Sequence, residues 1–70
     1  MQQWEYLFVY VGYERGLYRA QYINSVEIRD WKNGPEIATY LNQLGEQGWE
    51  AIGISQSTVS WQCLLKRPKP

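Results

Sequence analysis

Few side chains in this sequence have the chemistry that catalysis needs. Cys63 is the only cysteine among the 70 residues, and there is no histidine. A nucleophilic thiol needs a base beside it, and burial in a strand would raise the pKa of the thiol and keep it protonated. A single thiol without histidine also lacks the ligands of the usual zinc site. The sequence therefore predicts no catalytic nucleophile, no intrachain disulfide, no metal and no other cofactor.

Glu5 and Glu50 form the one pair of carboxylates that we consider for acid–base work, because each follows a tryptophan in an apolar segment. Such pairs catalyse glycoside hydrolysis in many enzymes. Acidic residues on strands more commonly form cross-strand pairs, and Lys66 and Arg67 are the candidate partners here. We favour the cross-strand pairs, and we expect that the protein is not an enzyme.

Residue types that are common at binding sites are more abundant in this sequence than residue types that catalyse reactions. Aromatic residues make up 16% of the chain, with four Trp, six Tyr and one Phe, which is more than a small core needs. Tyr, Trp and Arg are enriched at interaction hot spots, and aromatic rings beside arginines can stack a base or a nucleotide-like ligand. The candidate contacts for a ligand or partner are Tyr13, Arg15, Tyr18, Arg19, Tyr22, Trp31 and Trp61. The alternative is that they belong to the sheet and to a subunit interface.

The elements that position these residues begin with a strand from Trp4 to Val11. This segment is rich in aromatic and β-branched residues, which favour strands. Alternation places Trp4, Tyr6, Phe8 and Tyr10 on one face and Glu5, Leu7, Val9 and Val11 on the other. Both faces are mostly apolar, whereas an antiparallel strand usually keeps one face polar. Because one helix covers only one face of a small sheet, we expect a second subunit to cover the other.

A second strand is predicted from Leu17 to Ile23, after a hairpin connection at Gly12–Gly16. Asn24 and Ser25 are typical of a bulge or a short turn, and Val26–Trp31 either continues the strand or forms another. The pattern does not decide between one bent strand and two short ones. We favour one interrupted strand.

One helix is predicted, and it begins at Pro35, because proline suits a first helical position where its missing N–H would be unpaired anyway. Its buried stripe at helical period consists of Ile37, Leu41, Leu44 and Gly48. Gly48 is placed where the helix would end in a left-handed residue, and Trp49 would then anchor in the core. A phosphate-binding loop opens a helix, whereas Gly45 and Gly48 end this one.

Two more strands are predicted after the helix, from Trp49 to Ile54 and from Thr58 to Leu65. The last one alternates, with one side formed by Val59, Trp61, Cys63 and Leu65. The element order is β-β-α-β-β, which predicts an α+β fold with a mostly antiparallel four-stranded sheet and one helix packed on one face. Residues 1–70 form a single domain, without an internal repeat or a low-complexity linker.

Three short motifs occur in a fixed order along the chain: Trp4-Glu5-Tyr6, then Gln47-Gly48-Trp49-Glu50 after an Asn-Gln-Leu-Gly helix end, then Lys66-Arg67-Pro68. Over nearly the whole chain this arrangement resembles the bacterial and archaeal domain-of-unknown-function family 4177. The residues that carry the resemblance are Trp4, Tyr6, Gly48, Trp49 and Glu50. The resemblance implies a β-β-α-β-β domain with no established activity.

Two positions depart from the pattern of that family. Gln47 stands where the pattern has an acidic residue, and Leu7 stands where it has lysine. If the side of residue 7 is the usual polar side, the four aromatic residues of the first strand face the helix. Leu7, Val9 and Val11 then form the outer face, and we expect that face to be a subunit interface.

The charge balance and the length of the chain limit the classes of partner that the protein can have. Lys and Arg number seven and Asp and Glu number seven, so the chain lacks the basic field of a dedicated nucleic-acid binder. No apolar run approaches the ~20 residues of a membrane span, and the N-terminus has no signal-peptide pattern, so we expect a cytoplasmic protein without membrane contact. A chain this short has a marginal core, and without disulfides or metal the remaining means of stabilisation is oligomerisation.

These observations leave two functional interpretations. The first is a homo-oligomeric structural or protein-interaction module. The second is an oligomer that binds a small anionic or nucleotide-like ligand in an aromatic pocket between subunits. A retained small molecule in native mass spectrometry, or a thermal shift with nucleotides, would favour the second.

Overall fold

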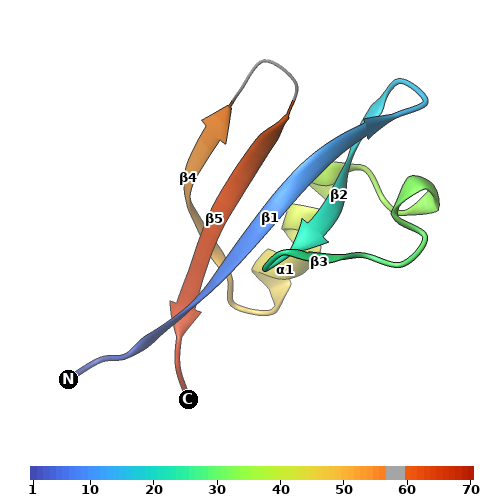
Figure 1. Ribbon diagram of the computed structural model, residues 1–70. Coiled ribbons are helices and arrows are strands. Elements are labelled where there is room, and N and C mark those ends of the chain that lie inside the picture. The colour runs from blue at the N-terminus through green and yellow to red at the C-terminus, as the bar shows by residue number, and fades with distance from the viewer. Residues whose placement is uncertain (57–59) are drawn as a thin grey trace.

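One antiparallel sheet with a helix on one of its faces makes up the computed structural model, which describes residues 1–56 and 60–70 (Figure 1). The elements in chain order are β1 (Trp4–Glu14), β2 (Leu17–Ile23), β3 (Val26–Glu27), a 3-10 turn η1 (Trp31–Asn33), α1 (Ile37–Glu46), β4 (Glu50–Gln56) and β5 (Trp61–Pro68). The predicted α+β class with a single helix is confirmed for these residues. The sheet has five strands in the order β3-β2-β1-β5-β4, so the predicted count of four is wrong by one.

The fifth strand exists because Asn24 and Ser25 form a two-residue turn, with φ angles of 49° and 70°. The turn pairs Ile23 with Val26 and Tyr22 with Glu27, so β2 and β3 form a tight hairpin. The favoured interpretation of one interrupted strand over this region is therefore wrong. Asparagine tolerates a left-handed backbone, but serine has no comparable preference. Because only one of the two turn residues indicates a turn, the sequence does not distinguish it from a bulge.

The longest strand, β1, lies at the centre of the sheet and pairs antiparallel with β2 on one side and β5 on the other. It continues to Glu14, into the predicted connection at Gly12–Gly16, and turns through Arg15 and Gly16, whose φ angles are 54° and 79°. Two consecutive positive φ angles are typical of the tight hairpin turns that match the twist of the flanking strands. The helix then connects this hairpin to the β4–β5 hairpin on the opposite side of β1.

The helix α1 begins two residues after Pro35, because Glu36 acts as its N-cap and accepts a 3.1 Å hydrogen bond from the N–H of Ala38. Its end at Gly48 is as predicted, but Gly48 is exposed and does not belong to the buried stripe. Gly48 has a φ of 91° and donates its N–H to the carbonyl of Gly45, while the N–H of Trp49 is donated to the carbonyl of Leu44. These two bonds are the Schellman arrangement, which requires a left-handed residue that glycine adopts at no steric cost.

The core lies between α1 and three of the strands. Among the described residues the buried apolar side chains are Val9, Val11, Ala20, Ile37, Leu44, Cys63 and Leu65. Leu7, Leu41 and Trp49 pack against this cluster from partly buried positions. Strand β4 contributes no buried residue, and all seven of its residues are exposed.

The burial pattern overturns the predicted face assignment. Val9 and Val11 are 0% and 2% exposed beneath the helix, and Leu7 packs against them, so these three residues do not form an outer interface. The aromatic residues of β1 occupy the opposite face. Alternation determines which residues of a strand share a face, and it does not determine which face the helix will cover. No helix among the described residues has the length and apolar character needed to cross a membrane.

Candidate interaction surface

The face of the sheet opposite α1, here called the outer face, carries four of the five exposed aromatic side chains of β1. Trp4, Tyr6, Phe8 and Tyr10 alternate along the strand, and each of these residues is between 39% and 56% exposed. We call these four residues the aromatic row. Side chains two residues apart on a strand point the same way and stand about 6.8 Å apart. The row therefore runs as a continuous ridge along the central strand.

Neighbouring strands extend the outer face on both sides of the ridge. The register places Leu64 opposite Phe8, Lys66 opposite Tyr6 and Tyr22 opposite Tyr10. The Tyr10 and Tyr22 rings meet edge to face with centroids 6.1 Å apart. Lys66 Nζ lies 4.2 Å from the ring centroid of Trp4, a cation–π contact at the end of the ridge.

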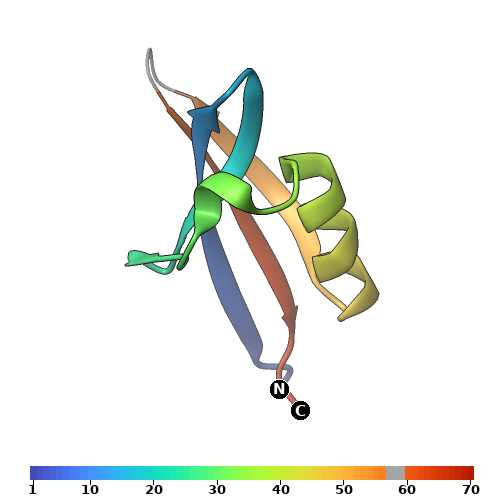
Figure 2. The same ribbon diagram turned by 90° about the vertical axis from the view of Figure 1, so that its right-hand side faces the viewer.

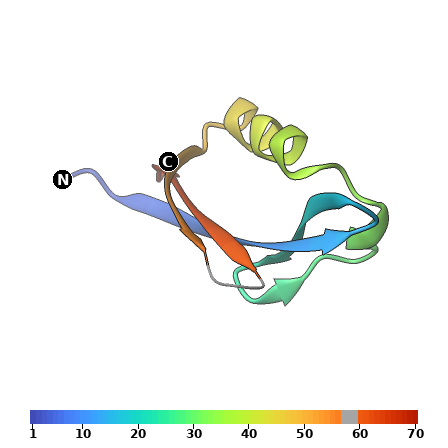
Figure 3. The same cartoon turned by 90° about the horizontal axis from the view of Figure 1, so that it is seen from above.

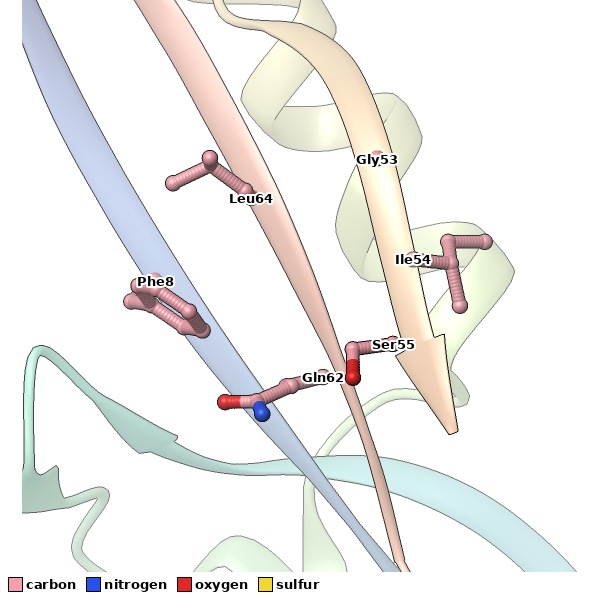
Figure 4. A pocket seen from close by; sticks show the side chains of 6 residues that line it. All are labelled: Phe8, Gly53, Ile54, Ser55, Gln62 and Leu64. Carbon is pink, nitrogen blue, oxygen red and sulfur yellow. The ribbon is translucent and has the colours of Figure 1, made fainter. Parts of the chain in front are cut away.

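Hollows flank the aromatic row. One of about 230 Å³ lies between Phe8 and β4 and is lined by Phe8, Gly53, Ile54, Ser55, Gln62 and Leu64 (Figure 4). Another of about 390 Å³ lies near the β2–β3 turn and is lined by Phe8, Tyr10, Asn24, Ser25 and Gln62. In Figures 2 and 3 the β2–β3 hairpin curls to the side of the sheet away from α1, so it forms a wall of this second hollow.

Asn24 holds that wall in place. Its N–H is donated to the carbonyl of Phe8, and its side-chain oxygen accepts the N–H of Phe8, both at 2.9 Å. One asparagine thus satisfies both backbone groups of Phe8 at the point where β2 leaves the sheet. The sequence analysis did not include Asn24 or Gln62 among the candidate contact residues. For Asn24 the available signal was the tolerance of asparagine for turn geometry.

The three sequence motifs meet at the end of the sheet where β1 begins and β5 ends. Arg67 Nε donates a 2.6 Å hydrogen bond to Glu5 Oε1, and its Nη1 donates to the carbonyl of Gln47 at 3.0 Å. Its guanidinium lies over the Trp49 ring at 4.3 Å. The predicted cross-strand pairing of Glu5 with Arg67 is confirmed. Glu50 is exposed and faces Lys66 in the register of β4 and β5.

The seven candidate ligand contacts lie in separate places. Tyr13, Tyr18 and Trp61 form one edge-to-face cluster near the β1–β2 turn, with centroid distances of 4.9 Å and 5.5 Å. Tyr22 lies on the outer face beside Tyr10. Trp31 packs against β1, where a Cβ at Gly12 would come within 2.9 Å of its ring.

The arginines of this set do not gather around an open aromatic pocket. Arg19 donates from Nε to the carbonyl of Gly34 at 2.9 Å and from Nη1 to the carbonyl of Glu14 at 2.6 Å. Arg15 sits in the β1–β2 turn with Nε 4.0 Å from a carboxylate oxygen of Glu14. A guanidinium that serves two backbone carbonyls has fewer donors left for an anion. The geometry thus favours a structural role for Arg19.

Cys63 is fully buried in the core, and this burial raises the pKa of its thiol. Burial likewise raises the pKa of the Tyr40 hydroxyl. A raised thiol pKa means less thiolate at neutral pH, and the thiolate is the reactive species. Within the described residues, no three Asp, Glu, Cys or His side chains gather in the manner of a metal site.

No protein-family model matches this chain, and neither the curated proteins nor the solved structures contain a match to it. The resemblance to domain-of-unknown-function family 4177 therefore stays a prediction. What the geometry identifies is a surface, the outer face, with a ridge of aromatic side chains and hollows beside it.

Proposed function

We propose that the protein is a homo-oligomeric structural or interaction module in which the outer face of one copy packs against the outer face of a second copy. The observation that carries this proposal is the exposure of the whole aromatic row on one sheet face. Aromatic side chains supply the largest apolar area of any residue type, and contiguous exposed apolar patches mark interaction sites.

The area agrees with a subunit contact. At about 150–250 Å² for a fully covered aromatic side chain, the half-exposed residues of the row offer roughly 100 Å² each, or about 400 Å² together. A standard stable interface covers about 800 Å² on each partner. The row supplies about half of this, and Tyr22, Leu64 and the hollows beside Phe8 supply neighbouring surface.

A second copy suits this face because the face has both a ridge and grooves. Hollows of about 230 Å³ and 390 Å³ adjoin the aromatic row at Phe8, so the ridge of one copy can enter a groove of its two-fold mate. A two-fold interface requires such self-complementarity, since each copy contributes the same patch. The chain also has a formal net charge of zero, so two copies meet without net repulsion.

The matched pair Tyr6 and Tyr13 tests this proposal, because their exposures are 56% and 59% and only Tyr6 belongs to the aromatic row. In Tyr6→Glu the new carboxylate lies opposite Lys66, so the substitution is tolerated in the isolated subunit. In the proposed dimer the same carboxylate would be buried in the interface, which disfavours association. We expect light scattering to give at least two copies for the wild type and for Tyr13→Glu, and a smaller mass for Tyr6→Glu.

A wild-type mass of one copy at micromolar concentration would contradict the proposal, as would an equal loss of mass in both variants. Circular dichroism of each variant checks that the fold is retained. Native mass spectrometry of the same samples addresses the ligand alternative, because a small mass retained by the wild type and lost in Tyr22→Ala would favour a pocket on this face.

A further inference from the structure

The strand β4 forms an open edge of the sheet (Figure 1). All seven residues from Glu50 to Gln56 are exposed, and β5 is the one strand that pairs with β4 in the described part of the chain. An edge strand presents a row of unpaired N–H and C=O groups that can pair with another chain. The opposite edge, β3, is only two residues long and includes a charged residue, Glu27.

Proteins usually protect long edges with lysine, proline, bulges or a covering helix. Between Ala51 and Gln56 this strand has no charged residue and no proline, and it exposes Ile52 at 44% and Ile54 at 64%. It does have one bulge, where Ala51 faces Leu65 and Gly53 faces Leu64, so that Ile52 is the extra residue. The regular and unprotected part of the edge is therefore Gly53–Gln56.

We propose that β4 pairs antiparallel with β4 of a second copy, with Ile54 on the two-fold axis. Opposite residues in a ladder share a face of the sheet, so the register must match the sides on which the side chains lie. Beyond the bulge, Gly53 and Ser55 face the outer side and Ile54 faces the helix side, as their partners on β5 show. With Ile54 opposite Ile54, Gly53 lies opposite Ser55, and the residues of these pairs share a face. Gln56 falls opposite the bulge residue Ile52, so the regular ladder covers Gly53–Ser55.

The chemistry of this segment favours a second copy over an unrelated strand. The self-pairing brings together two isoleucines whose side chains point away from Ser55 and Gln62 (Figure 4). No like charges oppose each other across Gly53–Gln56, because this segment has none. Apolar β-branched pairs across an antiparallel ladder contribute roughly 0.2–1 kcal/mol relative to alanine pairs.

The contact between the two β4 edges is short, so a stable assembly also needs the larger contact between outer faces. This inference therefore rests on the proposed function. Pairing through β4 joins two sheets into one, with both helices on one side and both aromatic rows on the other. Two such pairs can then stack through their outer faces into a closed assembly of four copies, in which two kinds of two-fold contact are satisfied.

Thiol cross-linking tests the register with a matched pair of variants. In the proposed ladder the Cβ atoms of two Ile54→Cys residues lie about 5 Å apart. In Gln56→Cys, on the same face, the two thiols are four residues apart along the strands, or roughly 13 Å. Oxidation or a short bis-maleimide should link Ile54→Cys into dimers within minutes and leave Gln56→Cys unlinked. The wild type is the control for Cys63, which is buried.

Mass measurements separate this inference from the face contact. We expect four copies for the wild type, two for Ile54→Lys, two for Tyr6→Glu and one for the double variant. If the wild type forms two copies, and Ile54→Lys leaves that mass unchanged, the edge pairing is wrong and the face contact stands. If Ile54→Cys cross-links but Tyr6→Glu has the wild-type mass, the face contact is wrong.

Equal cross-linking of Ile54→Cys and Gln56→Cys would overturn the proposed register. A failure of Ile54→Cys to cross-link while the wild type still forms four copies would overturn the edge pairing altogether. Ile54 is 64% exposed, so substitutions there leave the core intact, and circular dichroism of the single variants confirms that they fold.

Discussion

At the scale of single residues, Arg67 connects parts of the chain that are far apart in sequence. It reaches Glu5 on β1, the carbonyl of Gln47 at the end of α1, and the ring of Trp49. A positive charge is favourable at a helix C-terminus, where unpaired carbonyls carry partial negative charge. The planar guanidinium makes all three contacts at once, which a lysine ammonium does not.

Replacing Arg67 with lysine therefore tests geometry at constant charge. We expect Arg67→Lys to lower the free energy of unfolding by roughly 1–2 kcal/mol, from the lost hydrogen bonds and ring contact of a partly exposed group. Arg29→Lys, at an exposed arginine, should change stability by less than about 0.5 kcal/mol. Urea unfolding measures both. An equal effect of the two substitutions would mean that charge alone matters at position 67.

Cys63 gives the protein a pH dependence with a definite sign. Its pKa is raised by burial, so the folded state holds the thiol proton more tightly than the unfolded state does. This contribution to stability is complete below the unfolded thiol pKa of about 8.5 and is lost as the pH rises through the folded pKa. The raised pKa of Tyr40 acts in the same direction at still higher pH.

We therefore expect the free energy of unfolding to fall as the pH rises above the unfolded thiol pKa of about 8.5. The substitution Cys63→Val keeps a buried apolar side chain and removes the titrating thiol, so its loss of stability over this range should be smaller. Urea titrations at several pH values give the comparison. Identical slopes for the wild type and Cys63→Val would show that the thiol is not the responsible group.

At the scale of elements, the C-terminus of α1 contains two glycines with opposite requirements. Gly48 has a φ of 91°, in the left-handed region, whereas Gly45 is an ordinary helical position with open space around its Cβ direction. A residue with a Cβ is strained at position 48, whereas at position 45 it is favoured over glycine.

The two alanine substitutions should have effects of opposite sign. Gly48→Ala is expected to destabilise the protein by about 1 kcal/mol, because it strains the Schellman turn. Gly45→Ala is expected to stabilise it by roughly 0.5–1 kcal/mol through helix propensity. Thermal or urea unfolding measures both, with the same chemical change at each site. Destabilisation of similar size at both positions would show that the turn is not specific for glycine.

The ends of helices and strands, and the irregularities in strand pairing, were predictable to different degrees. From Trp61 to Leu65 the last strand alternates as predicted, with Cys63 and Leu65 buried. The predicted strand residues Thr58 and Val59 lie outside the described residues. The helix end at Gly48 follows from residue type alone. The bulge at Ile52 and the β2–β3 turn at Asn24 and Ser25 were not predictable. Both depend on pairing with other strands, which shifts the face of every residue beyond them.

At the scale of the whole molecule, the chain is extended for its length. Its radius of gyration is 12.4 Å and its principal extents are 44 × 23 × 19 Å, whereas about 11 Å is expected for a compact domain of this size. The 11-residue strand β1 alone spans roughly 36 Å at about 3.3 Å per residue. A small core with long arms leaves much surface for contacts with other copies, in agreement with the proposed assembly.

The candidate surface was only partly predictable. The sequence showed that both faces of β1 are mostly apolar, and from this we predicted that a second subunit covers one of them. The choice of Leu7, Val9 and Val11 as that face was wrong. The aromatic row was recognised as one face of a strand, but it was assigned to the core.

The sequence by itself determined the strand alternation, the helix with its glycine end, the α+β class and the scarcity of groups suited to catalysis, because all of these depend on residue type and local spacing. The tertiary structure alone decided which face of β1 the helix covers, that Arg67 joins the three motifs, and that β4 is left as an open edge. These features depend on contacts between residues far apart in the chain, which no local pattern specifies.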